Sequence, residues 1–247
     1  MSYEKELLEL KKCIFQKLEE FRTRDVEVSK KEDKSLVTEF DLFISLKVKE
    51  IFSFRHPDFH FYSEEHPEKF AFPCVVLDPI DGTREFVKGY GECAVSLAIL
   101  YSEDIFDMRN FGWIYNPFNG FEINNWLDVP VEKRKVSPPT THVMVSRSEW
   151  EKSIHKKSFP NDIRITPIGS IAYKLGLLAS GACDVVVSTR DKNVWDIAAG
   201  ILICHSRGLL SKSQGKMITK LHEEKFRAMF IWGREDDIAI IEPYLTS

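Results

Sequence analysis

The chain has 247 residues, of which 43% are hydrophobic and 12% aromatic, enough apolar material for one large folded unit or two lobes, which excludes intrinsic disorder. Its 34 Lys and Arg against 38 Asp and Glu give a formal net charge of −4, so no global basic field favours a nucleic acid polymer or an anionic membrane. The five cysteines are widely spaced and form no Cys-x-x-Cys pair, which argues against a disulfide framework or a zinc site and fits a cytoplasmic location.

The start of the chain alternates apolar residues with Glu and Lys and does not resemble a targeting peptide. No apolar run approaches the ~18 residues that a membrane span needs, so we expect no membrane contact. Apolar residues recur every three or four positions over residues 3–24 and again over 42–52, which predicts two amphipathic helices, the second with Thr38 as a candidate N-cap. Residues 74–77 predict a buried strand that ends in a turn at Asp78-Pro79.

Further along the chain, β-branched and aromatic residues predict five more strands, at 93–101, 111–115, 142–146, 184–188 and 229–232. Helical patterns occupy 148–157, 170–180, 195–206 and 236–245. This alternation implies layers of sheet and helix. Ser137-Pro138-Pro139 is the best candidate for a lobe boundary, because two prolines remove backbone donors and end either kind of element.

Five acidic residues stand in contexts that are unusual for solvated charges: Glu64, Glu65, Asp78, Asp81 and Asp196. Two carboxylates ~4 Å apart repel by ~4 kcal/mol at an effective dielectric of 20, so a cluster of them needs protons or a cation. Carboxylates, a backbone carbonyl and water suit Mg²⁺, whereas zinc favours His and Cys that are not clustered here. If these residues converge, they predict a magnesium site.

The Gly82-Thr83 step directly after Asp81 has a second use, because a small residue lets backbone N–H groups face an anion at the start of a helix. Phosphate would fit there. A metal cluster beside a phosphate cradle implies phosphoryl transfer to water. No Ser-His-Asp or Cys-His arrangement competes with that interpretation.

Each feature also has a purely structural interpretation. Glu64 and Glu65 alone would be a solvated pair, and Asp78 could simply belong to a turn. Asp196 could serve only as a first-turn charge favoured by the helix dipole, worth ~0.3–1 kcal/mol. Asp41 could likewise be only a first-turn acid, and this alternative stays open.

Residues 76–86 (Val-Leu-Asp-Pro-Ile-Asp-Gly-Thr-Arg-Glu-Phe) and 195–200 (Trp-Asp-Ile-Ala-Ala-Gly) resemble the two signature segments of the inositol monophosphatase superfamily of Mg²⁺-dependent, lithium-sensitive phosphatases. Glu64-Glu65, residues 37–41 and Gly169-Ser170 follow in the family's order. The resemblance runs from about Lys31 to Gly208 and therefore covers most of the chain.

The fold that this resemblance implies is α/β (α+β), a layered αβαβα sandwich of the inositol monophosphatase / fructose-1,6-bisphosphatase type. An N-terminal helix-and-sheet lobe over residues 1–137 would carry most metal ligands, and a C-terminal α/β lobe over residues 138–247 would complete the site in a single compact unit. A small phosphorylated metabolite is the expected partner, and a homodimer is compatible with the sequence.

The resemblance also implies a role for each matched residue. Glu64, Asp78 and the carbonyl of Ile80 resemble the ligands of a first ion, and Asp78 would bridge to a second ion held by Asp81 and Asp196. Two or three Mg²⁺ ions per site are expected, with Li⁺ as an inhibitor.

Two further sets of roles follow from the same resemblance. Glu65 would orient the attacking water, while Thr83 and Asp41 resemble the pair that accepts its proton. The residues matched to substrate binding are Gly82, Thr83, Ser146, Gly169, Ser170, Arg190 and Lys192.

Within the superfamily, Asp-Gly-Thr-Arg-Glu-Phe is closer to the Asp-Gly-Thr-Lys-Glu-Phe form of 3′(2′),5′-bisphosphate nucleotidases than to the Thr-Asn-Phe form of inositol monophosphatases. Lys31-Glu32-Asp33 and residues 145–148 (Val-Ser-Arg-Ser) also resemble the nucleotidases. We therefore expect a Mg²⁺-dependent phosphomonoesterase that hydrolyses the 3′-phosphate of adenosine 3′,5′-bisphosphate. Arg190 and Lys192 would pair with the phosphate that is retained.

The alternatives are an inositol monophosphatase or sugar bisphosphatase activity and, from another class, a catalytically weak regulatory or partner-binding member of the fold. Two departures from the family pattern motivate the last of these. Leu36 replaces the usual Pro, and Gly208-Leu209 replaces Gly-Gly, which affects a metal-site loop and the nearby substrate wall. Neither change removes a metal ligand.

Overall fold

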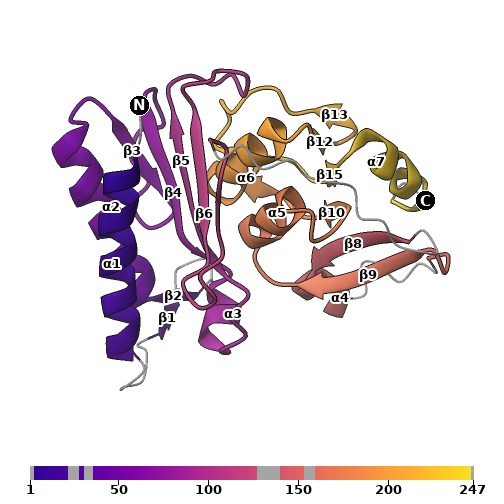
Figure 1. Ribbon diagram of the computed structural model, residues 1–247, viewed down its shortest axis with the longest axis horizontal. Coiled ribbons are helices and arrows are strands. Elements are labelled where there is room, and N and C mark those ends of the chain that lie inside the picture. Colours follow the sequence, from indigo (N-terminus) through magenta and orange to yellow (C-terminus); the bar gives the residue numbers. More distant parts are fainter. Residues whose placement is uncertain (1–2, 22–27, 31–35, 127–139, 153–158, 246–247) are drawn as a thin grey trace.

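Layers of helix and sheet alternate across the molecule in the order helix, sheet, helix, sheet, helix (Figure 1). The computed structural model describes residues 3–21, 28–30, 36–126, 140–152 and 159–245. The layers confirm the predicted αβαβα sandwich. The proposed lobe boundary at 137/138, with its two prolines, lies outside the described residues.

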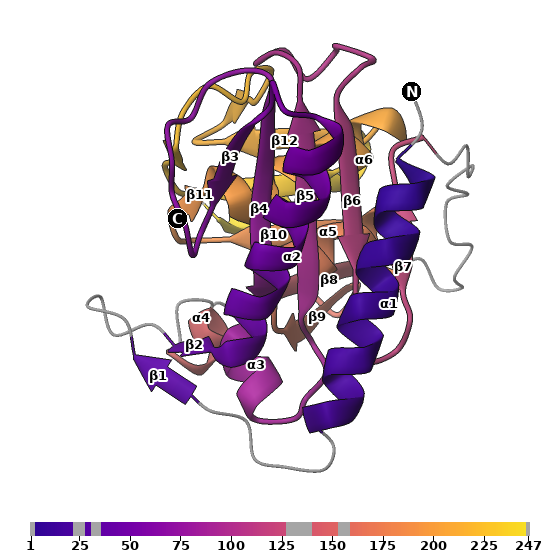
Figure 2. The same cartoon turned by 90° about the vertical axis from the view of Figure 1, so that its left-hand side faces the viewer.

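The first layer contains α1 (Glu4–Phe21) and α2 (Glu39–Arg55), which pack against each other and cover one face of the first sheet (Figure 2). Both predicted helices are confirmed, because their apolar stripes form one buried face. The Thr38 side chain accepts hydrogen bonds from the backbone N–H groups of Phe40 and Asp41, so Thr38 is the N-cap of α2 as predicted.

The first sheet has the strand order β3-β4-β5-β6-β7. Its strands are β3 (His60–Ser63), β4 (Cys74–Asp81), β5 (Ala94–Leu100), β6 (Phe111–Tyr115) and β7 (Glu122–Asn124). β3 runs parallel to β4, and the other neighbours are antiparallel. The predicted end of β4 at Asp78 is wrong, because the strand continues to Asp81 through a register shift against β5. Pro79 falls inside that shift, where the strand does not need its missing donor.

The middle layer contains α5 (Ile171–Ala179) and α6 (Val194–Ser206), both close to their predicted ranges. The second sheet has the order β13-β12-β15-β10-β8-β9. Its strands are β8 (Thr141–Ser146), β9 (Ile163–Ile168), β10 (Val185–Ser188), β12 (Leu210–Ser213), β13 (Lys216–Met217) and β15 (Phe230–Gly233). α7 (Glu235–Ile241) and the 3₁₀ helix η1 (Glu242–Tyr244) form the last layer and divide the helix predicted at 236–245.

Short elements complete the described chain: β1 (Val28–Lys30), β2 (Leu36–Thr38), α3 (Thr83–Val87), α4 (Arg147–Glu151), β11 (Lys192–Asn193) and β14 (Lys225–Phe226). α4 ends at Glu151, whereas the prediction extended to 157, and residues 153–158 lie outside the described chain. Strands β3, β9 and β12 were not predicted, because they are short or interrupted by polar residues and Pro167. Among the described helices, none combines the length and apolar character that a bilayer crossing requires.

Close packing fixes α6 against the first sheet. A Cβ added at Gly112 in β6 would lie 2.6 Å from the backbone oxygen of Ala199 in α6. Ile197, Ala198 and Ala199 are fully buried in the core between the two sheets. The position of α6 matters for function because its first turn carries Asp196.

We expect Gly112→Ala to lower the free energy of unfolding by about 1–3 kcal/mol, because the new methyl group overpacks the contact between β6 and α6. Leu8→Ala, at an exposed position on α1, serves as the control and should stay within about 0.5 kcal/mol of wild type. Urea unfolding measures both changes. Equal stability of the Gly112→Ala protein and wild type would contradict this packing argument.

Candidate active site

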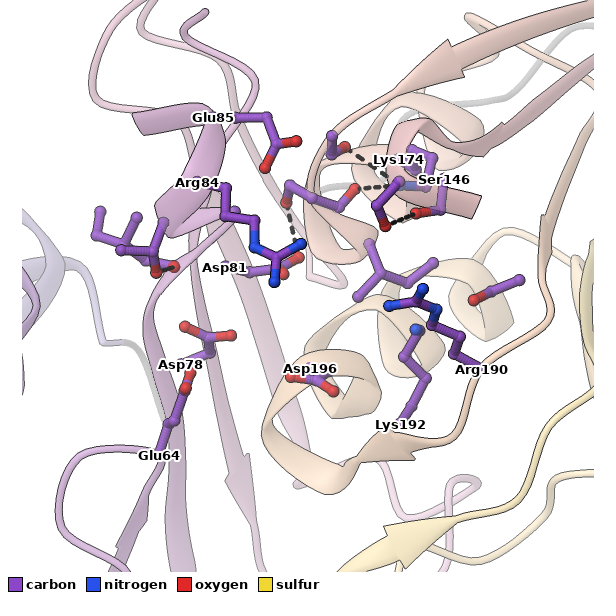
Figure 3. Close-up of a pocket in the computed structure, with 18 residues that line it drawn as sticks. Glu64, Asp78, Asp81, Arg84, Glu85, Ser146, Lys174, Arg190, Lys192 and Asp196 are labelled. Atoms are coloured by element: carbon purple, nitrogen blue, oxygen red, sulfur yellow. Dashed lines mark hydrogen bonds between the residues drawn. The ribbon is translucent and has the colours of Figure 1, made fainter. Parts of the chain in front are cut away.

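The C-terminal end of β4, the start of α6 and the segment between β9 and α5 surround a pocket of about 370 Å³ (Figure 3). Most of the site residues predicted from sequence line it: Glu64, Asp78, Ile80, Asp81, Gly82, Thr83, Ser146, Gly169, Ser170, Arg190, Lys192 and Asp196. The predicted catalytic residues Asp41 and Glu65 are not among the lining residues. The pocket therefore gathers residues from both halves of the sequence.

One side of the pocket is acidic, and local geometry explains how its carboxylates come together (Figure 3). β3 and β4 are parallel neighbours with Ser63 opposite Leu77. The backbone N–H of Glu64 donates to the Leu77 oxygen at 3.1 Å, which places Glu64 beside Asp78. Asp81 follows at the end of β4, and Asp196 comes from the first turn of α6. We call the side chains of Glu64, Asp78, Asp81 and Asp196 the acidic wall.

Two members of the acidic wall are oriented by hydrogen bonds from the protein. Asp81 Oδ2 accepts from Ser170 Oγ at 2.7 Å and from the Ala172 N–H at 2.5 Å. Asp196 Oδ2 accepts from the Asn193 N–H at 2.8 Å, in a capping box at the start of α6. Asp78 is 2% exposed, and its Oδ1 is buried without a hydrogen-bond partner among the described residues. A buried acceptor in that state is costly and marks a position for a ligand.

Burial and mutual repulsion disfavour charge on this wall. Burial raises the pKa of Asp78 well above its ordinary value, and the negative charges of Glu64 and Asp81 raise it further. Burial, followed by the charge of Asp81, raises the pKa of Asp196 to about 7. A bound cation would reverse both effects.

The donor set fits Mg²⁺ in its chemistry, because it consists of carboxylate oxygens with the Ile80 carbonyl beside them. The unpartnered oxygen of Asp78 supports the same conclusion. Over the described residues, no three His, Cys, Asp or Glu side chains stand close enough together to hold one ion as they are placed. The bonds from Asn193 and Ala172 engage one oxygen each of Asp196 and Asp81, and leave the other oxygen of each for an ion.

Thr83 connects the pocket with Asp41, which lies behind the pocket wall. The Thr83 hydroxyl is 3.3 Å from Asp41 Oδ1 and 3.0 Å from the Ile80 carbonyl oxygen, so it can donate its one proton to either. Asp41 Oδ2 accepts from both the N–H and the hydroxyl of Thr38. Burial raises the pKa of Asp41 to about 6, against the opposing effect of the bonds from Thr38. Asp41 therefore both caps α2 and contacts Thr83.

The predicted helix start after Asp81 is present. Gly82 has a φ of 95°, in the left-handed region, and is the N-cap residue of α3. The Phe86 N–H donates to the Gly82 oxygen at 2.9 Å, which closes the first turn. This turn places the backbone of Gly82 and Thr83 on the pocket wall next to Asp81.

The opposite side of the pocket is basic and hydroxyl-rich (Figure 3). Arg190 follows β10 and Lys192 lies in β11. Ser146 ends β8, and its Oγ is 3.1 Å from that of Ser148. Arg190 and Lys192 can bind an anion by charge-assisted hydrogen bonds, with the serine hydroxyls as further donors.

Six lining residues received no role from the sequence: Arg84, Glu85, Ser148, Ile171, Lys174 and Ser188. Lys174 is the one among them that a sequence signal could have revealed, because it is the only charged residue in the apolar helix Ile171–Ala179. It is 2% exposed, and burial lowers the pKa of its ammonium group to about 8.

The structure describes the side chain at one of the two positions at which the sequence departs from the family pattern. Leu209 is buried in the core between the sheets and does not line the pocket, so the replacement of Gly by Leu leaves the described pocket wall untouched. Lys31-Glu32-Asp33, which supported the nucleotidase resemblance, lie outside the described residues. The same holds for the side chain of Leu36.

Comparison with known proteins identifies the class. The profile of the inositol monophosphatase family matches residues 4–227, so the chain belongs to this family and is a phosphatase, a hydrolase. Two relatives are 3′(2′),5′-bisphosphate nucleotidase CysQ of Escherichia coli K12, 27% identical over 83% of this chain and 87% of that protein, and an inositol-1-monophosphatase of Synechocystis, 26% identical over 78% and 76%.

A solved structure of an IMPase/NADP phosphatase complexed with Mg²⁺ and phosphate shares the fold, with a TM-score of 0.76. It is 18% identical in sequence, and the match covers 99% of this chain and 95% of that one. The layered architecture is therefore that of the family.

The raised pKa values predict how the metal-free protein responds to pH. Asp41 and Asp196 have pKa values of about 6 and about 7 in the folded protein, against an ordinary Asp pKa of 3.8 in the unfolded chain. Between these values, the folded protein keeps protons that the unfolded chain has released. Their stabilising contribution is complete below about pH 4 and is lost as the pH rises through 6 to 7. We expect Asp196→Asn to lose less stability than wild type as the pH rises, because the amide of Asn does not titrate.

Urea unfolding without metal at about pH 5 and about pH 8 measures this effect. The stability of Asp196→Asn relative to wild type should rise by on the order of 1–3 kcal/mol between these two pH values. The amide keeps an acceptor oxygen for the Asn193 N–H, so the capping bond serves as an internal control. A difference that does not change with pH would contradict the prediction.

Proposed function

We propose that this chain is a Mg²⁺-dependent phosphomonoesterase whose preferred substrate is a small metabolite with two phosphate groups. The first candidate is adenosine 3′,5′-bisphosphate, from which it would hydrolyse the 3′-phosphate. The observation that carries the proposal is the pocket with an acidic wall on one side and Arg190 and Lys192 on the other. The similarity to CysQ nucleotidases supports the substrate, and the Mg²⁺ and phosphate in a structure of the same fold support the reaction type.

The acidic wall is the proposed metal site. Glu64, Asp78, Asp81, Asp196 and the Ile80 carbonyl would hold two or three Mg²⁺ ions. When bound, the ions neutralise the wall and polarise the phosphate for attack by water. Li⁺ is expected to inhibit, as the family resemblance implies.

Thr83 and Asp41 would together accept the proton of the attacking water. Thr83 Oγ1 lies on the pocket wall and can pass its own proton to Asp41 Oδ1, 3.3 Å away, as it accepts one from the water. Asp41 suits this role because a pKa of about 6 lies close to neutral pH. The charge of Glu65 contributes to that raised pKa, so Glu65 lies near Asp41 and could orient the water from there.

The remaining predicted residues would bind the substrate. The backbone at Gly82 and Thr83, together with Gly169 and Ser170, would surround the phosphate that is cleaved. Arg190, Lys192 and Ser146 would hold the phosphate that is retained. A substrate with two anionic groups would bind to both groups of donors.

Two other functions are the alternatives to this proposal. An inositol monophosphatase or sugar bisphosphatase would use the same acidic wall, and the similarity to the Synechocystis enzyme favours the former. A regulatory member of the fold with weak turnover is the alternative from another class. The acidic wall argues against it, because its carboxylates repel one another around one pocket and a bound cation would remove that cost.

The substrate assignment predicts that kcat/KM for adenosine 3′,5′-bisphosphate exceeds that for inositol 1-phosphate by at least about 10-fold, since charge-assisted hydrogen bonds to a second phosphate contribute ~1.5–3 kcal/mol. Phosphate release measures both rates. Arg190→Met should lower kcat/KM for the bisphosphate by a similar factor and leave that for adenosine 3′-monophosphate, which has no second phosphate, almost unchanged. Equal or reversed rates for the two wild-type substrates would remove the nucleotidase assignment.

The metal assignment predicts that Asp78→Asn lowers phosphate release more than ~100-fold, because even partners outside the ligand shell typically contribute 10–100-fold. Asp58→Asn, at an exposed position after α2, is the matched control and should retain wild-type activity. Thermal unfolding verifies that both variants are folded. Wild-type turnover by Asp78→Asn would refute the role of Asp78 as a bridging ligand.

A further inference from the structure

Lys174 is a buried cation among the residues that line the pocket. Its Nζ donates to the backbone oxygens of Ile168 at 3.1 Å, Gly169 at 3.2 Å and Ser170 at 2.8 Å. Burying an ammonium group is costly unless it has partners, and Lys174 is the only charged residue of helix α5. The packing of α5 alone does not explain why a lysine stands here. The three carbonyl oxygens that accept from its ammonium group do explain it.

These acceptors belong to one short segment, residues 168–170, which we call the strap. The strap connects β9 to α5, and Ser170 has a φ of 52°, in the left-handed region that non-glycine residues rarely adopt. Its conformation turns three successive carbonyl groups toward the Lys174 ammonium. Without that donor, these carbonyls would lose their shared partner, and the strained turn would lose one of its supports.

The strap also determines where Asp81 points. Ser170 Oγ and the Ala172 N–H both donate to Asp81 Oδ2. The Tyr173 N–H donates to Ser170 Oγ at 2.9 Å, which aims the hydroxyl proton of Ser170 at the carboxylate. A change in the strap therefore changes the orientation of Asp81.

The other side of the strap is also anchored. The Gly169 N–H donates to Glu92 Oε2 at 2.8 Å, and both carboxylate oxygens of Glu92 also accept from one guanidinium nitrogen of Arg147. Glu92 lies just before β5, so this anchor ties the strap to the first sheet. The strap is thus held between the two sheets, with Lys174 as its only buried cationic donor among the described residues.

We propose that Lys174 is a positioning residue for the metal site: its ammonium group fixes the strap, and the strap sets the carboxylate of Asp81 for binding Mg²⁺. The inference rests on the proposed function in one respect, namely that the acidic wall binds Mg²⁺. It assigns Lys174 no contact with substrate or ion. The charge of Lys174 also interacts favourably with that of Asp81.

The test is Mg²⁺ binding to the full chain without substrate, measured by isothermal titration calorimetry, for wild type and Lys174→Met. Methionine keeps the length and apolar stem of lysine but has no donor and no charge. We expect Mg²⁺ affinity to fall about 10–100-fold, the usual effect of losing a partner that orients a ligand. Leu178→Ala, at a buried position one turn further along α5, is the matched control. It should lower stability but leave Mg²⁺ affinity within about twofold, since leucine has no polar group that could orient a metal ligand.

A second variant tests the route through the strap. Ser170→Ala removes one donor to Asp81 and should also weaken Mg²⁺ binding. Because both changes act on the same carboxylate, the double variant should lose less affinity than the product of the two single losses. Multiplicative losses would show that Lys174 acts independently of the strap and would overturn the proposal.

Further outcomes separate this proposal from the proposed function. Mg²⁺ affinity within twofold of wild type in Lys174→Met overturns the positioning role and leaves the proposed function intact. If Lys174→Met does not fold, Lys174→Leu takes its place with the same criterion, because leucine also has neither a hydrogen-bond donor nor a charge. Wild-type protein that neither binds Mg²⁺ nor releases phosphate would overturn both proposals.

Discussion

Electrostatic repulsion among carboxylates that share one pocket is the constraint on which the rest of the structure depends. Glu64, Asp78, Asp81 and Asp196 line one pocket, and two of them have strongly raised pKa values because the protein removes water without supplying a counter-charge of equal size. A fold maintains such a cluster only if its scaffold is rigid. The tight contact of α6 with β6 and the parallel pairing of β3 with β4 provide that rigidity.

Much of this arrangement could be predicted from the sequence, because the decisive signals are local. The stripe of apolar residues in α1 and the Thr38 cap of α2 depend on neighbours within a few positions. The acidic residues were also recognisable, since the segments around Asp78 and Asp196 pair acids with apolar strands and helices. Family resemblance then indicated that these distant segments converge, which no local pattern can show.

The features that the sequence did not predict depend on long-range contacts. Lys174 was overlooked because its role comes from the strap, and a strained turn at Ser170 has no signature in residue type. The extension of β4 past Pro79 depends on a register shift against β5. Asp41 and Glu65 do not line the pocket, so their catalytic roles stay predictions, and the Thr83 hydroxyl gives Asp41 a path to the pocket.

The register shift in β4 has a consequence for how this chain can vary. Side chains three positions apart on a regular strand point to opposite faces of the sheet, so Asp78 and Asp81 could not share a cavity if β4 paired evenly with β5. The irregularity rotates the later residue round to the side of the earlier one. The spacing of these two acids and the irregularity in β4 therefore depend on each other, because an evenly paired strand would keep both acids on one face only if they stood an even number of positions apart.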